Sequence, residues 1–165
     1  MQIDNFKDMY LAELSELHSV ETQLTDALSK MAQTARHDGL RQAFDQHRQQ
    51  TEAQRDRVRG LLDRHGVDPD MHTDQSMARL INESEKMASI LTDPDIADAG
   101  LIGSAQRIEH YEIAAYGTAA TYADMLGFGE DARVLHQILD EEKAADSKLT
   151  MLATQVVNPD AVAAA

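Results

Sequence analysis

Acidic and imidazole residues interrupt the apolar stripes of four long helical segments, and each interruption lies near the middle of its segment. Residues three or four positions apart share one face of a helix, so these side chains point where their neighbours would be buried. Carboxylate and imidazole are ligands for divalent metal ions. The candidate metal ligands are Glu21, His47, Glu109, Glu112, Glu142 and Asp146.

The second stripe has three consecutive polar positions, His47, Thr51 and Gln54, with Gln50 beside them. Only His47 in this set is a strong metal ligand, because neutral amides and hydroxyls do not balance the charge of a dication as a carboxylate does. We therefore expect any metal position nearest this segment to bind more weakly than its neighbour.

Helix-forming residues dominate the segments between Gly, Pro and short polar clusters, and strands have almost no support. Asn5, Thr73 and Asp93-Pro94 are helix-start or helix-break signals, while Gly66 and Gly127 are helix-end signals. The expected helices cover residues of about 5–34, 38–66, 73–91, 96–126 and 130–157. Asn158-Pro159 is expected to end the last helix.

Short connections predict that the first two helices and the last two helices each form an antiparallel hairpin. The connector between the hairpins carries the helix at 73–91, which is long enough to cross most of a bundle. These features predict an all-α fold, a ferritin-like four-helix bundle with a long crossover that carries a short extra helix. The alternative is an ordinary bundle that this helix caps at one end. Residues 1–158 form a single domain, and 159–165 are expected to be a flexible tail.

Antiparallel pairing brings the polar interruptions to one level. Folding the first hairpin near residue 36 places Glu21 opposite Thr51, and folding the second near Phe128 places Glu109 and Glu112 opposite residues near 147 and 144. Buried carboxylates repel one another, and no Lys or Arg occupies these stripe positions. Bound cations, shared protons or a wet cavity could compensate. A pair of divalent metal ions matches the charge best.

Composition excludes several classes of function. The 165 residues include 15 Lys and Arg against 29 Asp and Glu, a formal net charge of −14 that disfavours nucleic acid and anionic membranes. The chain has no Cys, which excludes disulfides, thiolate metal sites and iron–sulfur clusters. With no signal-like or membrane-spanning apolar run, a cytoplasmic protein is expected.

Several motifs resemble the YciE/YciF-like ferritin-like family of small bacterial stress-associated proteins. The most specific is Glu-His-Tyr-Glu-Ile-Ala-Ala-Tyr-Gly-Thr, which begins at Glu109, and the others lie at residues 10–14, 20–24, 42–51 and 139–146. The likeness covers nearly the whole chain. The resemblance implies a ferritin-like bundle, frequent homodimers and a di-iron or related metal site, with iron preferred to manganese or zinc. The spacing of Glu109, Glu112 and Glu142 also resembles the second half of rubrerythrin-type sites.

The sequence departs from ferritin-type centres in one respect. Such centres take a Glu-x-x-His pair from each of two helices, whereas here Glu142 is followed by Ala145 and Asp146, and Gln50 stands where relatives often carry Glu. One metal position is therefore expected to be weakened.

Two functional hypotheses remain open. The first is a metal-binding protein that handles metal or works as an oxidoreductase, with dioxygen, peroxide or ferrous iron as the small substrate. The second is a non-enzymatic stress or interaction protein in which a buried polar layer specifies helix register. In the second hypothesis His47 is a core histidine bonded to Thr51 or to a carboxylate, and Asp146 lies at the edge of the stripe.

Overall fold

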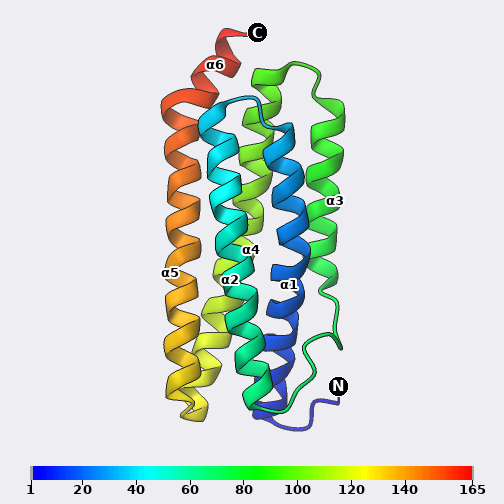
Figure 1. The fold of residues 1–165 in the computed structure, drawn as a ribbon, viewed down its shortest axis with the longest axis vertical. Coiled ribbons are helices and arrows are strands. Elements are labelled where there is room, and N and C mark those ends of the chain that lie inside the picture. The colour runs from blue at the N-terminus through cyan, green and yellow to red at the C-terminus, as the bar shows by residue number, and fades with distance from the viewer. Residues whose placement is uncertain (1, 165) are drawn as a thin grey trace.

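The computed structural model describes residues 2–164, and these residues form helices joined by short loops, without a strand (Figure 1). The expected all-α class is therefore confirmed. In chain order the elements are α1 (Phe6–Thr34), α2 (Asp38–Arg64), α3 (Gln75–Ile90), α4 (Pro94–Leu126), α5 (Gly129–Leu152), a π-helical turn (Ala153–Val157) and α6 (Asn158–Ala163).

The helix ends follow the local sequence signals. Oδ1 of Asn5 accepts a hydrogen bond from the N–H of Asp8 at 3.0 Å, which caps the start of α1. Gly66 and Gly127 have φ of 69° and 72°, the left-handed conformation that ends α2 and α4 at low steric cost. The expected cap of α3 was wrong by one residue, because Asp74 rather than Thr73 accepts the N–H of Met77.

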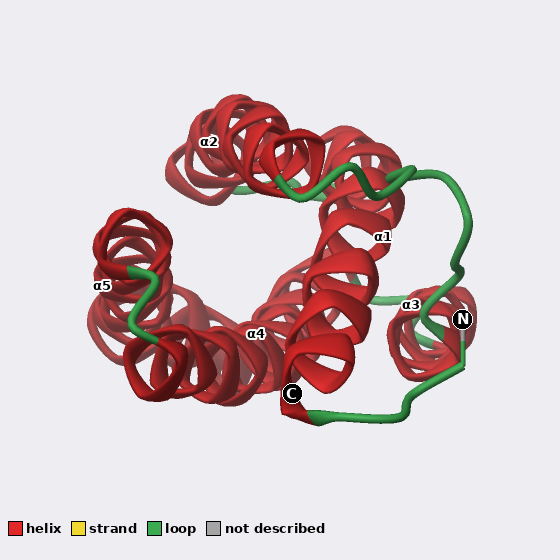
Figure 2. Cartoon of the chain, turned by 90° about the horizontal axis from the view of Figure 1, so that it is seen from below, coloured by secondary structure: helices red, strands yellow, loops and turns green. Residues whose placement is uncertain are grey.

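Two antiparallel hairpins, α1–α2 and α4–α5, make up the bundle, and α3 connects them (Figure 1). Seen from one end, α3 lies outside the four long helices and runs alongside α1 and α4 (Figure 2). This position confirms the crossover arrangement over the alternative in which the short helix caps one end. α2 and α5 come from different hairpins and lie side by side in the bundle.

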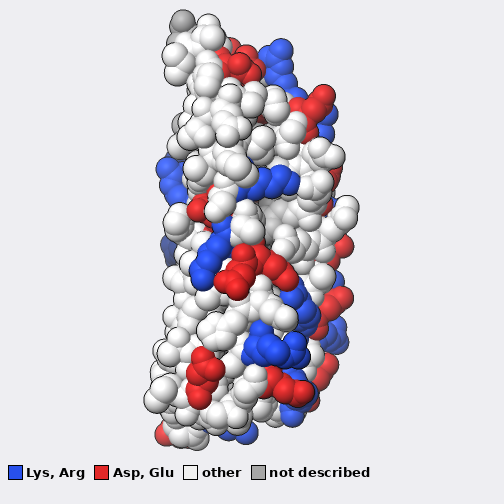
Figure 3. Space-filling view, turned by 90° about the vertical axis from the view of Figure 1, so that its left-hand side faces the viewer, with Lys and Arg blue, Asp and Glu red and all other residues white. Residues whose placement is uncertain are grey.

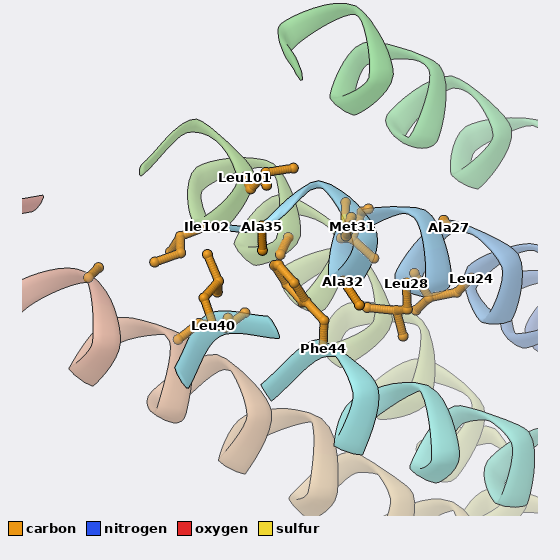
Figure 4. Packing of buried hydrophobic residues seen from close by; sticks show 14 of the residues in the cluster. Leu24, Ala27, Leu28, Met31, Ala32, Ala35, Leu40, Phe44, Leu101 and Ile102 are labelled. Carbon is orange, nitrogen blue, oxygen red and sulfur yellow. The ribbon is translucent and has the colours of Figure 1, made fainter. Parts of the chain in front are cut away.

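Buried apolar side chains form two clusters, one towards each end of the bundle. The first cluster surrounds the α1–α2 connection, where Phe44 packs among Leu28, Ala32 and Leu40 (Figure 4). The second cluster is centred on Tyr10 at the opposite end and includes parts of all four long helices. The polar interruptions of α2, α4 and α5 fall between the stretches that supply the two clusters, so the polar side chains meet at mid-bundle.

The C-terminal segment differs from expectation. Asn158-Pro159 does not end the last helix, because the chain passes through the π-helical turn and continues as α6 to Ala163. Pro159 lies in the first turn of α6, where a missing N–H and a fixed φ are compatible with a helix. Much of the segment expected to be a flexible tail, 159–165, is therefore helical, and residue 165 lies outside the described residues.

None of the helices within residues 2–164 combines the length and apolar character needed to cross a membrane.

Candidate metal centre

A layer of polar side chains separates the two apolar clusters and draws on α1, α2, α4 and α5. Its carboxyl groups are almost completely buried: the exposed fraction is 0% for Glu21, Glu112 and Glu142, and 1% for Glu109. Carboxylates are rarely buried to this extent without a compensating partner. We call this set the polar layer; its members are Glu21, His47, Thr51, Gln54, Glu109, Glu112 and Glu142.

Four members of the polar layer bring ligand atoms to one point. One atom each from His47, Glu109, Glu112 and Glu142 lies within 4.8 Å of all the others. Nε2 of His47 is 2.9 Å from Oε1 of Glu109 and 3.9 Å from Oε2 of Glu142. One imidazole and three carboxylates form a mixed nitrogen and oxygen donor set that suits divalent transition metals. This group of four could therefore hold a metal ion.

Several oxygens of this group have no hydrogen-bond partner among residues 2–164. They are both carboxyl oxygens of Glu112, Oε2 of Glu109 and Oε2 of Glu142. A buried polar atom left unpaired costs about 1–3 kcal/mol, and native structures contain few of them. Because Glu109, Glu112 and Glu142 each bring one oxygen to the common point, a bound cation would provide a partner that these carboxyl groups otherwise lack. The residues present therefore fit a metal.

Glu21 lies outside the group of four and has a partner of its own. The hydroxyl of Tyr116 donates to Oε1 of Glu21, and both side chains are fully buried. Oε2 of Glu21 has no partner within the described chain. Glu21 thus has one oxygen that is hydrogen-bonded to Tyr116 and one oxygen that is unpaired within the described residues.

A chain of polar contacts leads from the polar layer to the surface. The amide nitrogen of Gln54 donates to Oε1 of Glu142 and, at 3.0 Å, to Oε2 of Glu141. Arg57 in turn donates from Nη1 to Oε1 of Glu141 at 3.1 Å. Partners of this kind fix the orientation of a ligating carboxylate. Gln54 is therefore a positioning residue for Glu142.

Burial and repulsion between carboxylates favour the protonated form of Glu21, Glu112 and Glu142. Burial raises the pKa of Glu21 to about 8. Burial, followed by repulsion from neighbouring carboxylates, raises the pKa of Glu112 and of Glu142 well above the usual range. Burial alone would lower the pKa of His47, but the adjacent Glu109 carboxylate outweighs it and the pKa is raised. A binding cation would displace these protons, since metal ligands must be deprotonated.

Asp146 does not join the cluster. It is half-buried, and its Oδ1 accepts a hydrogen bond from the amide of Gln106 at 3.1 Å and lies 3.6 Å from Nε2 of His110. His110 itself is largely exposed, although it lies between Glu109 and Glu112 in sequence. The structure therefore brings together His47, Glu109, Glu112 and Glu142, with Glu21 adjacent, and leaves Asp146 apart.

The sequence did not reveal the partners that hold the carboxylates. Tyr116 and Gln54 lie on the apolar stripes, but periodicity does not say which carboxylate each one contacts. Arg57 lies off the stripe of α2, one turn after Gln54, and its long side chain reaches Glu141 beside the polar layer. The spacing of one helical turn between Gln54 and Arg57 was the sequence signal that could have indicated this contact.

Comparisons with known proteins agree on one family. The family described as "Domain of unknown function (DUF892)" matches residues 5–162. Protein YciF of Escherichia coli (strain K12) is 38% identical over 162 residues, which cover 98% of each chain. The crystal structure of this E. coli stress protein aligns with a TM-score of 0.88 over 94% of the present chain and 98% of YciF.

Two further solved structures are similar. YcfI from Rhodopseudomonas palustris has a TM-score of 0.87 and 34% identity, and the alignment covers 90% of this chain and 95% of that one. A protein from Xanthomonas campestris pv. campestris has a TM-score of 0.77 over 96% and 95% of the two chains, but at 20% identity it supports the fold alone. On the family match and the identity to YciF, the chain belongs to the DUF892 family, which includes the YciF-like proteins that its motifs resemble.

Proposed function

We propose that this chain is a ferritin-like metal-binding protein whose polar layer holds two divalent ions, iron in preference to manganese or zinc. The observation that carries the proposal is the convergence of four buried ligand groups whose oxygens are largely unpaired. The mixed imidazole and carboxylate donors suit iron, whereas structural zinc sites favour closed sets of thiolate and imidazole.

Each member of the layer has a role in this proposal. His47, Glu109, Glu112 and Glu142 hold the first ion, and Glu21 supplies a further carboxylate for the second. Tyr116 and Gln54 orient Glu21 and Glu142 through their hydrogen bonds. Asp146, half-buried and bonded to Gln106, is not assigned as a ligand.

Iron in such a site supplies redox chemistry, for which the small substrate would be dioxygen, peroxide or ferrous iron. The chain contributes apolar surroundings, because two apolar clusters flank the layer towards both ends of the bundle. It also contributes groups that hold or release protons, since the carboxyl groups favour protonation until a cation replaces the protons.

Elemental analysis of protein purified without added metal tests this function. We expect about two iron or manganese ions per chain, the number that paired carboxylates in a bundle hold. Replacing Glu109→Ala together with Glu142→Ala should abolish binding, because the two residues supply ligand atoms from both helices of one hairpin.

The matched control removes one exposed carboxylate from each of the same two helices, Asp124→Ala with Asp140→Ala. This variant should retain the metal of the wild type. Full metal content in the Glu109 and Glu142 double variant would refute the site.

A structural polar layer is the second candidate, and one observation favours it. The bonds from Tyr116 to Glu21 and from Gln54 to Glu142 already satisfy part of the layer with protein groups. In that case the protein would contain no stoichiometric metal and its melting temperature would not respond to added metal. The metal-free Glu109 and Glu142 double variant would then lose much stability, whereas relief of repulsion in a metal site predicts little loss or a gain.

A further inference from the structure

A pocket of about 170 Å³ lies between α2 and α5 and reaches the polar layer. Its walls are mainly apolar, with Ala43 and Phe44 from α2 and Ala145 and Leu149 from α5, and His47 and Glu109 also line it. An apolar cavity of about 150 Å³ in another protein accepts benzene, so this volume suits a body of roughly that size. The pocket therefore joins the candidate metal ligands to the outside of the bundle.

The rim of the pocket carries a cation without a charged partner. Nζ of Lys148 donates to the neutral amide oxygen of Gln46 at 2.6 Å, and Lys148 makes no ion pair within residues 2–164. The carboxylate on the rim, Glu141, is paired with Arg57 instead. Basic and acidic side chains adjoin one another near mid-height on the face that carries α5 (Figure 3). The rim thus has an uncompensated positive charge beside an apolar recess.

We propose that this pocket binds a small organic anion, with its charged group at Lys148 and its apolar body between α2 and α5. Charge complementarity selects the anionic group, and the alanine, phenylalanine and leucine walls select the body. The two carboxylates that line the pocket have partners of their own, because Glu109 lies 2.9 Å from Nε2 of His47 and Glu141 is paired with Arg57. Lys148 is therefore the charged group of the lining that has no charged partner within residues 2–164. The bound molecule lies against His47 and Glu109; its role as a substrate of the metal centre rests on the proposed function, whereas its binding does not.

Benzoate is the probe, compared with benzyl alcohol and benzylamine, which have similar bodies and different charges. Each is titrated into the full chain as purified and after chelation of metal, with binding measured by calorimetry and by NMR of side-chain methyl groups. We expect benzoate to bind most tightly in both forms and to shift the methyl signals of Ala145 and Leu149.

Three variants test which residues bind the charged group of the ligand and which bind its apolar body. Lys148→Gln should weaken benzoate binding by up to about fivefold, the upper end of the range for one exposed ion pair, and leave benzyl alcohol unchanged. Lys143→Gln removes the same charge from the same helix, but Lys143 faces Asp140 at 3.5 Å and does not line the pocket, so benzoate binding should not change. Ala145→Leu should fill the recess and prevent binding of both benzoate and benzyl alcohol.

Absence of saturable benzoate binding up to about 10 mM would overturn the proposal, as would equal effects of the two lysine variants. Circular dichroism and metal content of Ala145→Leu show whether that variant keeps its fold. A protein that holds metal but not benzoate would refute the pocket ligand alone. A protein that binds benzoate through Lys148 but holds no metal would refute the metal function and leave the pocket ligand intact.

Discussion

Burial and metal binding favour opposite protonation states of a carboxyl group in the polar layer. Burial favours the protonated form, whereas metal binding requires the ionised form. Glu112 shows the conflict most clearly, because neither of its oxygens has a partner in the described chain. Glu21 has the Tyr116 hydroxyl as a partner, yet its pKa is still raised to about 8. The stability of the metal-free protein should therefore depend on pH.

We predict that the melting temperature of the metal-free protein falls as the pH rises from about 5 to about 8.5. A carboxyl group whose pKa is raised on folding, such as Glu21, stabilises the fold below its unfolded pKa of 4.5, and this contribution is lost as the pH rises through about 8. The raised pKa of His47 acts in the same direction. Thermal melts in the presence of a chelator measure the effect.

Two further measurements test whether the buried carboxyl groups of the polar layer cause this pH dependence. Glu21→Gln combined with Glu112→Gln should flatten the pH dependence, because amides do not titrate in this range. Saturating metal should reverse the slope, since metal binding improves as the ligands lose protons. A melting temperature that is constant or rises over the same pH range in chelator would contradict the prediction. It would show that ionisation of the Glu21 and Glu112 carboxyl groups does not lower the stability of the fold.

Gln50 provides a second prediction at single-residue resolution. It is half-buried and lines the pocket beside His47, Glu109 and Glu141. Gln50→Glu adds a negative charge next to the proposed centre and should raise occupancy of the weaker of two metal positions. Gln49→Glu, an exposed neighbour on the same helix, is the control and should leave occupancy unchanged. Metal titration followed by calorimetry resolves the two positions; two equally tight sites unaffected by Gln50→Glu would contradict the prediction.

Among the elements, α4 is tied to the α1–α2 connection by one buried carboxylate. Oδ1 of Asp98 accepts the backbone N–H of Arg36 at 2.9 Å, and Oδ2 accepts the N–H of His37 at 2.7 Å. These bonds satisfy two backbone amides just before the start of α2 and join the two hairpins at one end of the bundle. The contact should be energetically important, because Asp98 is only 2% exposed.

Asp98→Ala is predicted to destabilise the protein by about 2–4 kcal/mol, because two charge-assisted hydrogen bonds from a buried carboxylate to the part-buried amides of Arg36 and His37 are lost. Denaturant unfolding of the metal-free protein measures the change. Asp95→Ala is the control: its carboxylate forms only a half-exposed ion pair with Arg36 at 3.6 Å, so the loss should be about 1 kcal/mol or less. Equal losses for the two variants would contradict a special role for Asp98.

Helix boundaries were largely predictable because they depend on local chemistry. Caps such as Asn5 and left-handed glycines such as Gly127 act within a few residues of their own position. The prediction for Pro159 was wrong for the same local reason, since a proline fits the first turn of a helix as well as the residues that follow its end. Asp146 shows the other limit: helical spacing placed it one turn from Glu142, but contacts with Gln106 and His110 hold it at the edge.

At the scale of the whole molecule, loop lengths indicated the two hairpins and the crossover, because short connections leave few ways to arrange long helices. Convergence of polar stripes likewise indicated the level of the polar layer. What could not be predicted were contacts between distant helices, such as Gln54 with Glu142, which depend on rotamers and on relative helix rotation.

Net charge gives a prediction for the entire chain. A formal charge of −14 at pH 7 produces self-repulsion that dissolved ions screen. Raising sodium chloride from about 20 mM to about 300 mM should therefore increase the melting temperature of the metal-free protein by a few degrees. Differential scanning calorimetry measures the shift, with a neutral osmolyte at equal osmolality as the control. A melting temperature that falls with salt would mean that attractive ion pairs, such as Arg57 with Glu141, outweigh the repulsion.

The polar layer draws on both hairpins, with His47 in the first and Glu142 in the second. An ion held by both residues would join points far apart along the chain and restrict the freedom of the unfolded polypeptide, as a covalent bridge between them would. Because the chain has no cysteine, such an ion would be a reversible cross-link in place of a disulfide. The lifetime of the folded protein in the cell would then follow the supply of metal.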